Sequence, residues 1–293
     1  MPPGHPERPD RLRAIWRALE DEPFAGLVRR PARLADESVL ATAHDPEYVA
    51  AIRDAVPAEG LVLLDADTAL SPKSFIAASH GAGAACLAVE EVMGGRVANA
   101  FCAIRPPGHH AEPDRAMGFC LFNNAVIAAR HAQRHFGAER VAIVDFDVHH
   151  GNGTQAIVWE DPTILYASTH EMPLYPGTGS PSETGVGNIV NAPLSPGDGG
   201  PEFQEAFTTL VLPALTRFAP DLVVISAGFD GHWRDPLASI NLHEADFAWA
   251  TTALMEVADK WAGGRIVSLL EGGYDLVGLA GSAAAHVATL MTA

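Results

Sequence analysis

The chain has 293 residues, and with 48% of them hydrophobic it can bury one large core or two small ones. Its formal net charge of −17 argues against a nucleic-acid-binding surface, which needs basic patches, and suits a cationic substrate or a metal ion. No stretch is apolar and long enough for a transmembrane helix, so we expect no membrane partner and no signal peptide. Three cysteines without zinc-type or redox-type spacing predict free thiols and a cytoplasmic location.

The first third of the chain is predicted to be mainly helical. One run, LVLLDADTALSP (61–72), instead predicts a strand that breaks into a loop carrying Asp65 and Asp67. The expected helices are, in order, 11–20, 37–42, 46–55 and 72–93.

From residue 99 onward, short apolar strands alternate with helices. This alternation predicts βαβ units, a parallel sheet covered on both faces, and an α/β fold. No linker interrupts the pattern, so we expect a single domain over residues 1–293. The strands are expected at 99–104, 141–146, 164–169, 189–194, 221–230 and 265–270, and the helices at 124–136, 201–218, 243–261 and 276–291.

The most unusual segment is VAIVDFDVHHGNG, residues 141–153. Its apolar start predicts a strand buried on both faces. In an extended chain Asp145, Asp147 and His149 would share one face, and the two glycines that follow would end the strand. Two carboxylates and an imidazole at a buried strand end are costly unless a cation satisfies them. A divalent metal meets that need, and the alternative is a salt-bridged strand end with surface histidines.

Other polar residues also lie just after the C-terminal ends of predicted strands. Ligands of open α/β sheets bind beyond these ends, so we expect the residues to converge on one crevice. Asp147, His149 and Asp230 would then form a set of three oxygen and nitrogen ligands, which with one open position is typical of catalytic zinc. The converging residues are His109, His110, Asp147, His149, Asp230 and Tyr274.

The histidine pair His109-His110 follows a Pro-Pro-Gly turn. Tandem histidines at a loop tip are often simply solvated, but beside a metal-activated water one of them can take a proton and return it to a leaving amine. Tyr274 can donate a hydrogen bond to an oxyanion, or it can be a tyrosine packed at a strand end. Asp145 is better placed to hold a histidine than to bind the metal.

Five motifs stand in order along the chain: RPPGHH, GFCLFNNAVIAA, VDFDVHHGNGTQ, SAGFD with the following RDPL, and LEGGYDL. Together they resemble the zinc-dependent histone deacetylase family, including its bacterial amidohydrolases and the related acetylpolyamine amidohydrolases. The resemblance runs from Gly4 to the C-terminal helix. It implies an arginase-like fold, with three layers, α/β/α, on a mostly parallel sheet.

The resemblance also implies roles for individual residues. The three-ligand set would hold one Zn²⁺ per chain. His110 would be the general base and acid, and its partner Asn152 would orient the ring without adding charge. His109 would be an electrostatic partner bonded to Asp145, and Tyr274 would polarise the acyl carbonyl together with zinc.

A second set of implied residues binds the substrate and a structural ion. Gly118-Phe119 and Tyr175 would line an acyl-lysine tunnel, and Asp67 would grip the substrate backbone at its rim. Leu237, in RDPL, stands where the polyamine deacetylase of animals has a glutamate, so it favours acetyl-lysine. A structural K⁺ or Na⁺ would lie beside the zinc strand, held by Asp145, Asp147, His149 and Ser168.

The expected activity is hydrolysis of an N-acyl amine. Acetyl-lysine in a peptide or protein is the first substrate, and acetylpolyamines or other small acylated amines are the alternative. A ureohydrolase with two manganese ions would want paired carboxylates on the second metal strand, and SAGFD offers only Asp230. A binding module without activity would be expected to lack one of the site residues. Neither the preferred acyl chain nor the oligomeric state follows from the sequence.

Two features depart from the family pattern. Relatives usually begin with a strand ahead of the GHPERP segment, whereas this sequence starts three residues before Gly4. We therefore expect a truncated start or an absent edge strand, which would affect one rim of the tunnel. In addition, Trp233 lies three residues after Asp230 and is expected either to narrow the tunnel mouth or to pack on the surface.

Overall fold

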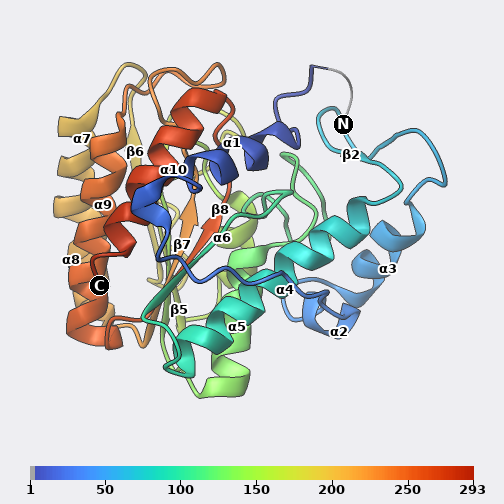
Figure 1. Cartoon of the computed structure of the whole chain (residues 1–293). Coiled ribbons are helices and arrows are strands. Elements are labelled where there is room, and N and C mark those ends of the chain that lie inside the picture. The colour runs from blue at the N-terminus through green and yellow to red at the C-terminus, as the bar shows by residue number, and fades with distance from the viewer. Residues whose placement is uncertain (1–3) are drawn as a thin grey trace.

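The computed structural model describes residues 4–293 and shows a central sheet between two layers of helices (Figure 1). Six strands form this sheet in the order β3-β8-β7-β4-β5-β6, and every pairing between them is parallel. The predicted three-layer α/β/α fold is therefore confirmed. The strands are β3 (Asn99–Cys102), β4 (Val141–Asp145), β5 (Ile164–Glu171), β6 (Ile189–Leu194), β7 (Leu222–Ala227) and β8 (Ile266–Leu270).

The central strands are buried along their whole length. Every residue of β4, β7 and β8 is buried, and most of them are Val, Ile, Leu or Ala. A strand covered on both faces has no exposed side to fill with polar residues. This explains why continuous apolar runs, and not alternating patterns, marked these strands in the sequence.

Two groups of helices cover the sheet. In Figure 1, α1 and α10 lie with α7, α8 and α9 on one side, while α4 and α5 lie on the other, next to α2 and α3. No helix within residues 4–293 has the length and apolar character needed to cross a membrane. The first group is α1 (Asp10–Ala18), α7 (Gly200–Ala206), α8 (Leu212–Phe218), α9 (Glu244–Val257) and α10 (Leu276–Leu290); the second is α2 (Glu37–Leu40), α3 (Pro46–Asp54), α4 (Ser74–Met93) and α5 (Asn124–Phe136).

Local signals set the ends of several helices. At the start of α5 the Asn123 side chain accepts the N–H of Val126, and Gly137 ends the helix in the left-handed conformation with φ 68°. Asp275 caps α10 in the same way by accepting the N–H of Gly278. These caps explain why the predicted bounds of α5 are confirmed at both ends.

The run 61–72 differs from the prediction of one strand. It forms an antiparallel hairpin of two short strands, β1 (Val62–Leu63) and β2 (Ala69–Leu70). The turn between them carries both predicted carboxylates, and Oδ1 of Asp65 accepts the N–H groups of Asp67 and Thr68. An aspartate that binds backbone donors two and three residues ahead turns the chain back on itself.

The predicted helices 201–218 and 243–261 each contain a π-helical turn. One lies at Phe207–Val211 between α7 and α8, and the other at Ala258–Ala262 after α9. Pro213 follows the first turn and has no N–H to donate, which favours a local change of helical register.

A seven-residue helix, α6 (Asn152–Val158), was not predicted. The glycines at 151 and 153 indicated only a chain break. In the structure a Cβ on Gly153 would lie 2.2 Å from the carbonyl oxygen of Ala111. Close packing therefore explains this glycine, and α6 brings Asn152 next to the loop that follows β3.

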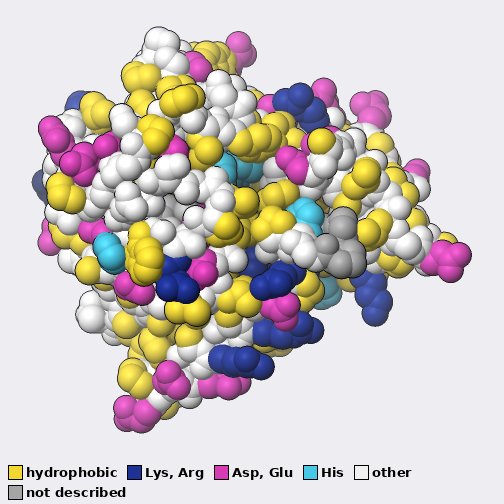
Figure 2. Space-filling model, turned by 90° about the horizontal axis from the view of Figure 1, so that it is seen from above, with side chains coloured by type: hydrophobic (Ala, Val, Ile, Leu, Met, Phe, Trp, Pro, Cys, Tyr) yellow, Lys and Arg dark blue, Asp and Glu magenta, His cyan; other side chains and the backbone are white. Residues whose placement is uncertain are grey.

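The order of the strands creates a crevice at the centre of the sheet. After β3 the chain crosses to β4, continues outward to β5 and β6, and then returns to β7, between β4 and β8. The segments that follow β4 and β7 are thereby neighbours, and open α/β sheets bind ligands at such points. Figure 2 looks onto this face, where histidine side chains show near the middle among hydrophobic ones.

Candidate active site and metal centre

The segment after β4 is a tight turn and not an extended strand. β4 ends at Asp145, whose Oδ1 accepts the N–H of Asp147, and Oδ1 of Asp147 in turn accepts the N–H of His149. Such bonds curl the chain because short carboxylates compete with the sheet for backbone donors. The expectation that one strand face would align all three residues was therefore wrong.

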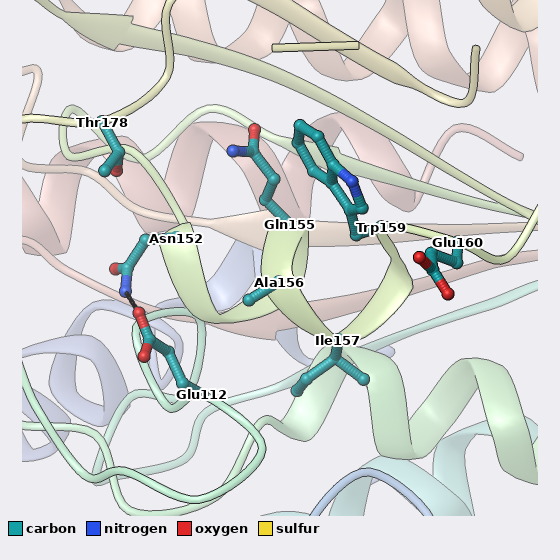
Figure 3. A pocket seen from close by; sticks show the side chains of 8 residues that line it. All are labelled: Glu112, Asn152, Gln155, Ala156, Ile157, Trp159, Glu160 and Thr178. Carbon is teal, nitrogen blue, oxygen red and sulfur yellow. Dashed lines mark hydrogen bonds between the residues drawn. The ribbon is translucent and has the colours of Figure 1, made fainter. Parts of the chain in front are cut away.

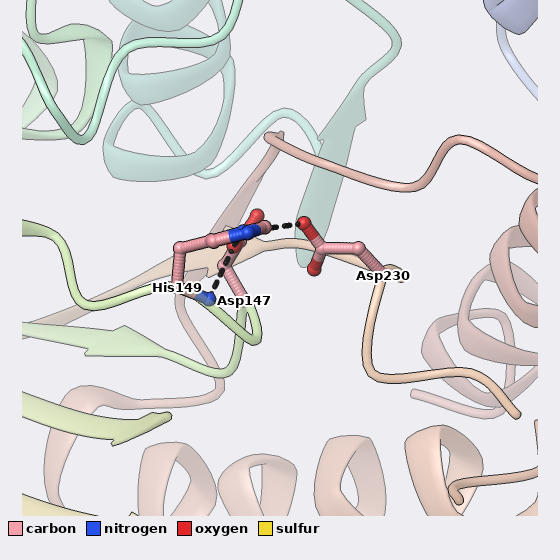
Figure 4. A group of neighbouring side chains, drawn as sticks. All are labelled: Asp147, His149 and Asp230. Atoms are coloured by element: carbon pink, nitrogen blue, oxygen red, sulfur yellow. Dashed lines mark hydrogen bonds and ion pairs between the residues drawn. The ribbon is translucent and has the colours of Figure 1, made fainter. Parts of the chain in front are cut away.

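Asp147, His149 and Asp230 nevertheless converge, with Asp230 coming from the loop after the neighbouring strand β7 (Figure 4). Nδ1 of His149 lies 3.2 Å from Oδ1 of Asp147 and 3.0 Å from Oδ2 of Asp230. His149 is 8% exposed, whereas both aspartates are fully buried. The imidazole is therefore the side of the cluster that solvent can reach.

Two glycines make room for the aspartates. A Cβ on Gly228 would lie 2.0 Å from Oδ2 of Asp147, and one on Gly272 would lie 2.1 Å from Oδ2 of Asp230. The Gly272 N–H donates to Oδ2 of Asp147 at 2.7 Å, and the Val148 N–H donates to Oδ1 of Asp230 at 2.9 Å. Backbone donors thus orient both carboxylates. A compact set of two oxygen ligands and one nitrogen ligand fits a catalytic zinc ion.

The electrostatics of the cluster also suit a cation. Burial opposes a charge on His149, but hydrogen bonds to Asp147 and Asp230 outweigh it and raise the pKa of the imidazole to about 10. Burial raises the pKa of Asp230, and the charge of Asp147 raises it further. Positive charge is thus stabilised between two carboxylates at a buried position. A divalent cation would meet the same requirement.

His109 makes the hydrogen bond to Asp145 that we expected. Its Nδ1 lies 3.0 Å from Oδ2 of Asp145, and that oxygen also accepts the hydroxyl of Tyr166 at 3.0 Å. Burial lowers the pKa of His109, but the charges of Asp147 and Asp145 outweigh it and hold the pKa well above its ordinary value. The arrangement favours a positively charged ring.

His110 has a different environment. Its Nδ1 lies 2.8 Å from Oδ1 of Asn152, and its ring centroid lies 4.0 Å from that of His109 and 6.0 Å from that of His149. Burial, followed by the charges of His109 and His149, lowers the pKa of His110 well below its ordinary value. A neutral imidazole keeps a lone pair, which a general base needs.

The loop that carries both histidines is anchored by Glu271, which was not predicted. Its Oε2 accepts the N–H groups of Gly108 at 2.6 Å and His109 at 3.1 Å, and its Oε1 accepts the hydroxyl of Ser226 at 3.2 Å. Burial raises the pKa of Glu271 to about 7. A charged residue directly after an apolar strand was the signal that could have identified it.

Tyr274 is held by two further residues that were not predicted. Asp235 accepts its N–H at 2.6 Å, and the guanidinium of Arg11 lies over its ring, 4.9 Å from the centroid. Arg11 is fully buried and donates to two backbone carbonyls of the same loop. Burial raises the pKa of Tyr274 well above its ordinary value, against the opposing charge of Arg11. The phenol therefore keeps its proton.

Aromatic rings surround these polar groups. The ring of Phe119 lies 5.8 Å from that of Tyr274, and the ring of Tyr175 lies 5.2 Å from that of His110. A Cβ on Gly118, which has φ 56°, would lie 2.3 Å from the His110 ring. Glycine at this position therefore allows the loop that carries Phe119 to approach the histidine pair.

The hairpin turn lies next to Phe119, whose N–H donates to Oγ1 of Thr68 at 3.2 Å. Nε2 of His5 lies 3.4 Å from the carbonyl oxygen of Asp67, and the His5 ring meets the Phe119 ring edge-on at 4.8 Å. Burial raises the pKa of the Asp67 carboxyl. The turn thus brings the predicted rim carboxylate into the neighbourhood of the predicted tunnel wall.

The remaining predicted residues lie around this group. Ser168 on β5 is the register partner of Asp145 on β4. The N–H of Leu237 donates at 3.0 Å to Asp235, the residue that holds Tyr274.

Trp233 lies on the surface. Its side chain is 50% exposed, and its ring lies beside His243 and under the guanidinium of Arg234. This exposure is what packing on the surface predicts for the residue.

Known proteins share both the sequence pattern and the fold. The sequence model of the histone deacetylase domain matches residues 5–290. This chain belongs to the histone deacetylase family. It is 39% identical over 277 residues to a histone deacetylase-like amidohydrolase of Pseudomonas aeruginosa, which covers 92% of this chain and 73% of that relative. It is also 39% identical over 284 residues to a probable deacetylase of Archaeoglobus fulgidus, which covers 94% and 78%.

A solved structure extends the likeness to three dimensions. The HD domain of HDA15 matches with a TM-score of 0.94 at 38% identity, over 100% of this chain and 86% of that one. As a histone deacetylase family member the chain is a hydrolase that acts on amides. The family is zinc-dependent, and the buried Asp147, His149 and Asp230 could hold that metal.

Proposed function

We propose that this hydrolase removes the acetyl group from the side-chain amine of acetyl-lysine in a peptide or protein. The observation that supports it most is the convergence of three kinds of group. The ring of His110 lies 6.0 Å from that of His149, and Tyr274 stands two residues after Gly272, whose N–H donates to Asp147 at 2.7 Å. A base, a metal-ligand set and a phenol together suit hydrolysis of an amide carbonyl.

In this proposal Asp147, His149 and Asp230 hold Zn²⁺, which when bound polarises the acyl carbonyl and acidifies water. His110 takes the proton of the attacking water at its free ring nitrogen and later returns a proton to the leaving amine. Tyr274 donates a hydrogen bond to the carbonyl oxygen as negative charge develops there.

Neighbouring residues would support these steps. His109, charged through its bond to Asp145, would balance the negative charge of the reacting atoms. Asn152 would orient the ring of His110. A structural K⁺ or Na⁺ beside β4 belongs to the same proposal, held by oxygens of Asp145, Asp147, His149 and Ser168.

The residues around the cluster suit a lysine side chain. Phe119 and Tyr175 would face its aliphatic part, Gly118 would let Phe119 approach, and Asp67 would bind the peptide backbone. Leu237 offers no carboxylate to a second amine and so favours acetyl-lysine over an acetylpolyamine. We place the enzyme in the cytoplasm because its three cysteines are free and buried.

Acetylated polyamines are the second candidate substrates, because the hairpin turn carries two carboxylates, Asp65 and Asp67. The test compares the zinc-loaded enzyme on an acetyl-lysine peptide, acetylputrescine and acetylspermidine in one assay. We expect the largest kcat/KM for the peptide. A larger value for an acetylpolyamine would replace the first candidate by the second. Failure to hydrolyse any of the three with one zinc per chain would contradict the proposal.

A further inference from the structure

The amide of Asn152 lies between two side chains from another part of the chain. Its Oδ1 lies 2.8 Å from Nδ1 of His110, and its Nδ2 donates to Oε1 of Glu112 at 2.7 Å. Figure 3 shows the second of these contacts, with Asn152 at the start of α6 and Glu112 on the facing loop. Three side chains thus form one continuous line of hydrogen bonds, from the surface to the histidine pair.

Glu112 determines which end of the amide faces inward. A carboxylate carries no hydrogen and can only accept, so the amide group facing it must be the Nδ2 donor. Arg115 donates to the same oxygen at 3.0 Å, which holds the glutamate in place. The carbonyl end of Asn152 is therefore the end that faces His110.

The orientation of the amide decides the tautomer of the imidazole. An amide oxygen can only accept, so Nδ1 of His110 must carry the hydrogen, and Nε2 keeps its lone pair. A flipped amide would present its NH₂ to Nδ1 and would stabilise the tautomer with hydrogen on Nε2. That tautomer has no lone pair at Nε2 with which to take a proton.

We propose that Glu112 is a positioning residue that acts through Asn152 to keep His110 in the tautomer with a free Nε2. The inference rests on the proposed role of His110 as the general base. Beyond the pairing of His110 with Asn152, it assigns a role to the Glu112 carboxylate, which does not contact the imidazole itself.

The location of Glu112 makes the inference testable. Glu112 is half-buried and lines a surface pocket of about 570 Å³, together with Asn152 and Glu160. An apolar side chain of similar size can replace it without opening the hydrophobic core. Glu160 lies in the same pocket, is exposed, and provides a matched control.

The activity experiment compares four variants of the zinc-loaded enzyme. Glu112→Leu removes the acceptor, and we expect kcat to fall about 10- to 100-fold, the range found for partners that orient metal-bound histidines, with little change in KM. Glu112→Gln keeps a carbonyl oxygen that can accept from Asn152 and should retain most of the activity. The control Glu160→Gln should match the wild type. A Glu112→Gln enzyme as poor as Glu112→Leu would show that charge matters and orientation does not, which overturns the inference.

The fourth variant adds Asn152→Asp to Glu112→Leu. An aspartate presents an acceptor to Nδ1 whichever way it is turned, so Glu112 is no longer needed, and kcat should rise above that of Glu112→Leu alone. A role of Glu112 in packing predicts no such recovery. If the double variant is no better than Glu112→Leu, the inference is wrong.

The tautomer itself can be observed without turnover. Long-range ¹H–¹⁵N spectra of ¹⁵N-histidine-labelled protein, with the His110 signals assigned by a His110→Gln variant, should show hydrogen on Nδ1 in the wild type. In Glu112→Leu a mixture or the Nε2–H form is expected, and an unchanged Nδ1–H pattern would overturn the inference. Failure of the wild type to hydrolyse acylated amines would affect the proposed function and leave this measurement intact.

Discussion

Two buried histidines show how the same side chain serves either a reactive site or the core. His149 lies in the turn after β4, and His286 lies in α10, with exposures of 8% and 0%. His149 contacts two carboxylates, at 3.2 and 3.0 Å. The ring nitrogens of His286 instead bond to hydroxyl groups, those of Thr251 at 2.6 Å and Ser268 at 2.8 Å.

The partners, and not the depth of burial, separate the two residues. Burial lowers the pKa of both rings, and on His286 it lowers the pKa to about 3. On His149 the hydrogen bonds to Asp147 and Asp230 reverse the shift and raise the pKa to about 10. Burial thus keeps a core histidine with hydroxyl partners neutral, whereas carboxylate partners create a site for positive charge.

Removing a carboxylate that contacts His149 should have the largest effect on activity. Asp230→Ala takes away one metal ligand and leaves the other two incomplete, so we expect loss of bound zinc and activity at background level. Elemental analysis of the purified variant checks the metal content. Asp259→Ala, at an exposed position beyond α9, should keep both zinc and activity. Stoichiometric zinc in Asp230→Ala would exclude Asp230 as a ligand.

Removing the phenol should have the next largest effect. Tyr274→Phe deletes one hydrogen-bond donor to the oxyanion, and such a loss costs about 10²–10³ in kcat. The ring and its contacts with Arg11 and Phe119 remain, so zinc content and thermal stability should stay at wild-type values. Turnover close to that of the wild type would remove Tyr274 from the mechanism.

Neutralising Asp145 should lower the pKa of His109, and so bring it closer to the low pKa of the core residue His286. Asp145→Asn removes one of the three carboxylate charges that raise the pKa of His109, so the pKa should fall, and we expect kcat to fall about 10- to 100-fold. An NMR titration of the His109 ring and steady-state kinetics measure the two effects. Tyr166→Phe removes a hydrogen bond to Asp145 but keeps its charge, so its effect should be smaller. Equal losses in both variants would mean that the charge is not decisive.

The smallest expected effect is that of His286 on the pH dependence of the free energy of unfolding. His286 has a pKa of about 3 when folded, against an ordinary value of 6.5. Between these values the unfolded chain binds a proton that the folded chain does not, so stability falls as the pH falls from 6.5 toward 3. At pH 5 the loss should be about 2 kcal/mol.

The measurement is urea unfolding at pH 7 and pH 5. His286→Gln should be about 1–3 kcal/mol less stable at pH 7, because it disturbs a buried hydrogen-bond network, and should lose less stability on acidification than the wild type. His135→Gln, at an exposed position in α5, should keep the wild-type pH dependence. The same pH dependence in His286→Gln and in the wild type would show that His286 is not the titrating group.

Much of the fold could be predicted because its signals are local. The caps at Asn123 and Gly137 bound α5, and apolar runs mark the central strands β4, β7 and β8. Errors arose where a side chain binds nearby backbone. Asp65 turns a predicted strand into a hairpin, and Asp145 ends β4 two residues before Asp147.

The candidate site also contains residues that the sequence predicted and residues that it did not. The expected ligands and the histidine pair stand in recognisable motifs after strand ends, and in the structure Asp147, His149 and Asp230 lie close enough together to hold a metal ion. The residues that hold them, such as Glu271 and Arg11, were not predicted. The position of Glu271 after an apolar strand was a signal, whereas Arg11 looks ordinary in an amphipathic helix and only its distant partners show that it is buried.

The sequence by itself determined the alternation of strands and helices, the identity of the polar groups at strand ends, and the family. Only the tertiary structure decided how those groups are oriented. The Gly272 N–H that orients Asp147 lies 125 residues away along the chain, and the Gly273 carbonyl that accepts from Arg11 lies 262 residues away. The orientation of these groups depends on contacts between segments this distant along the chain. No local sequence pattern records such contacts, because the two partners meet only when the sheet assembles.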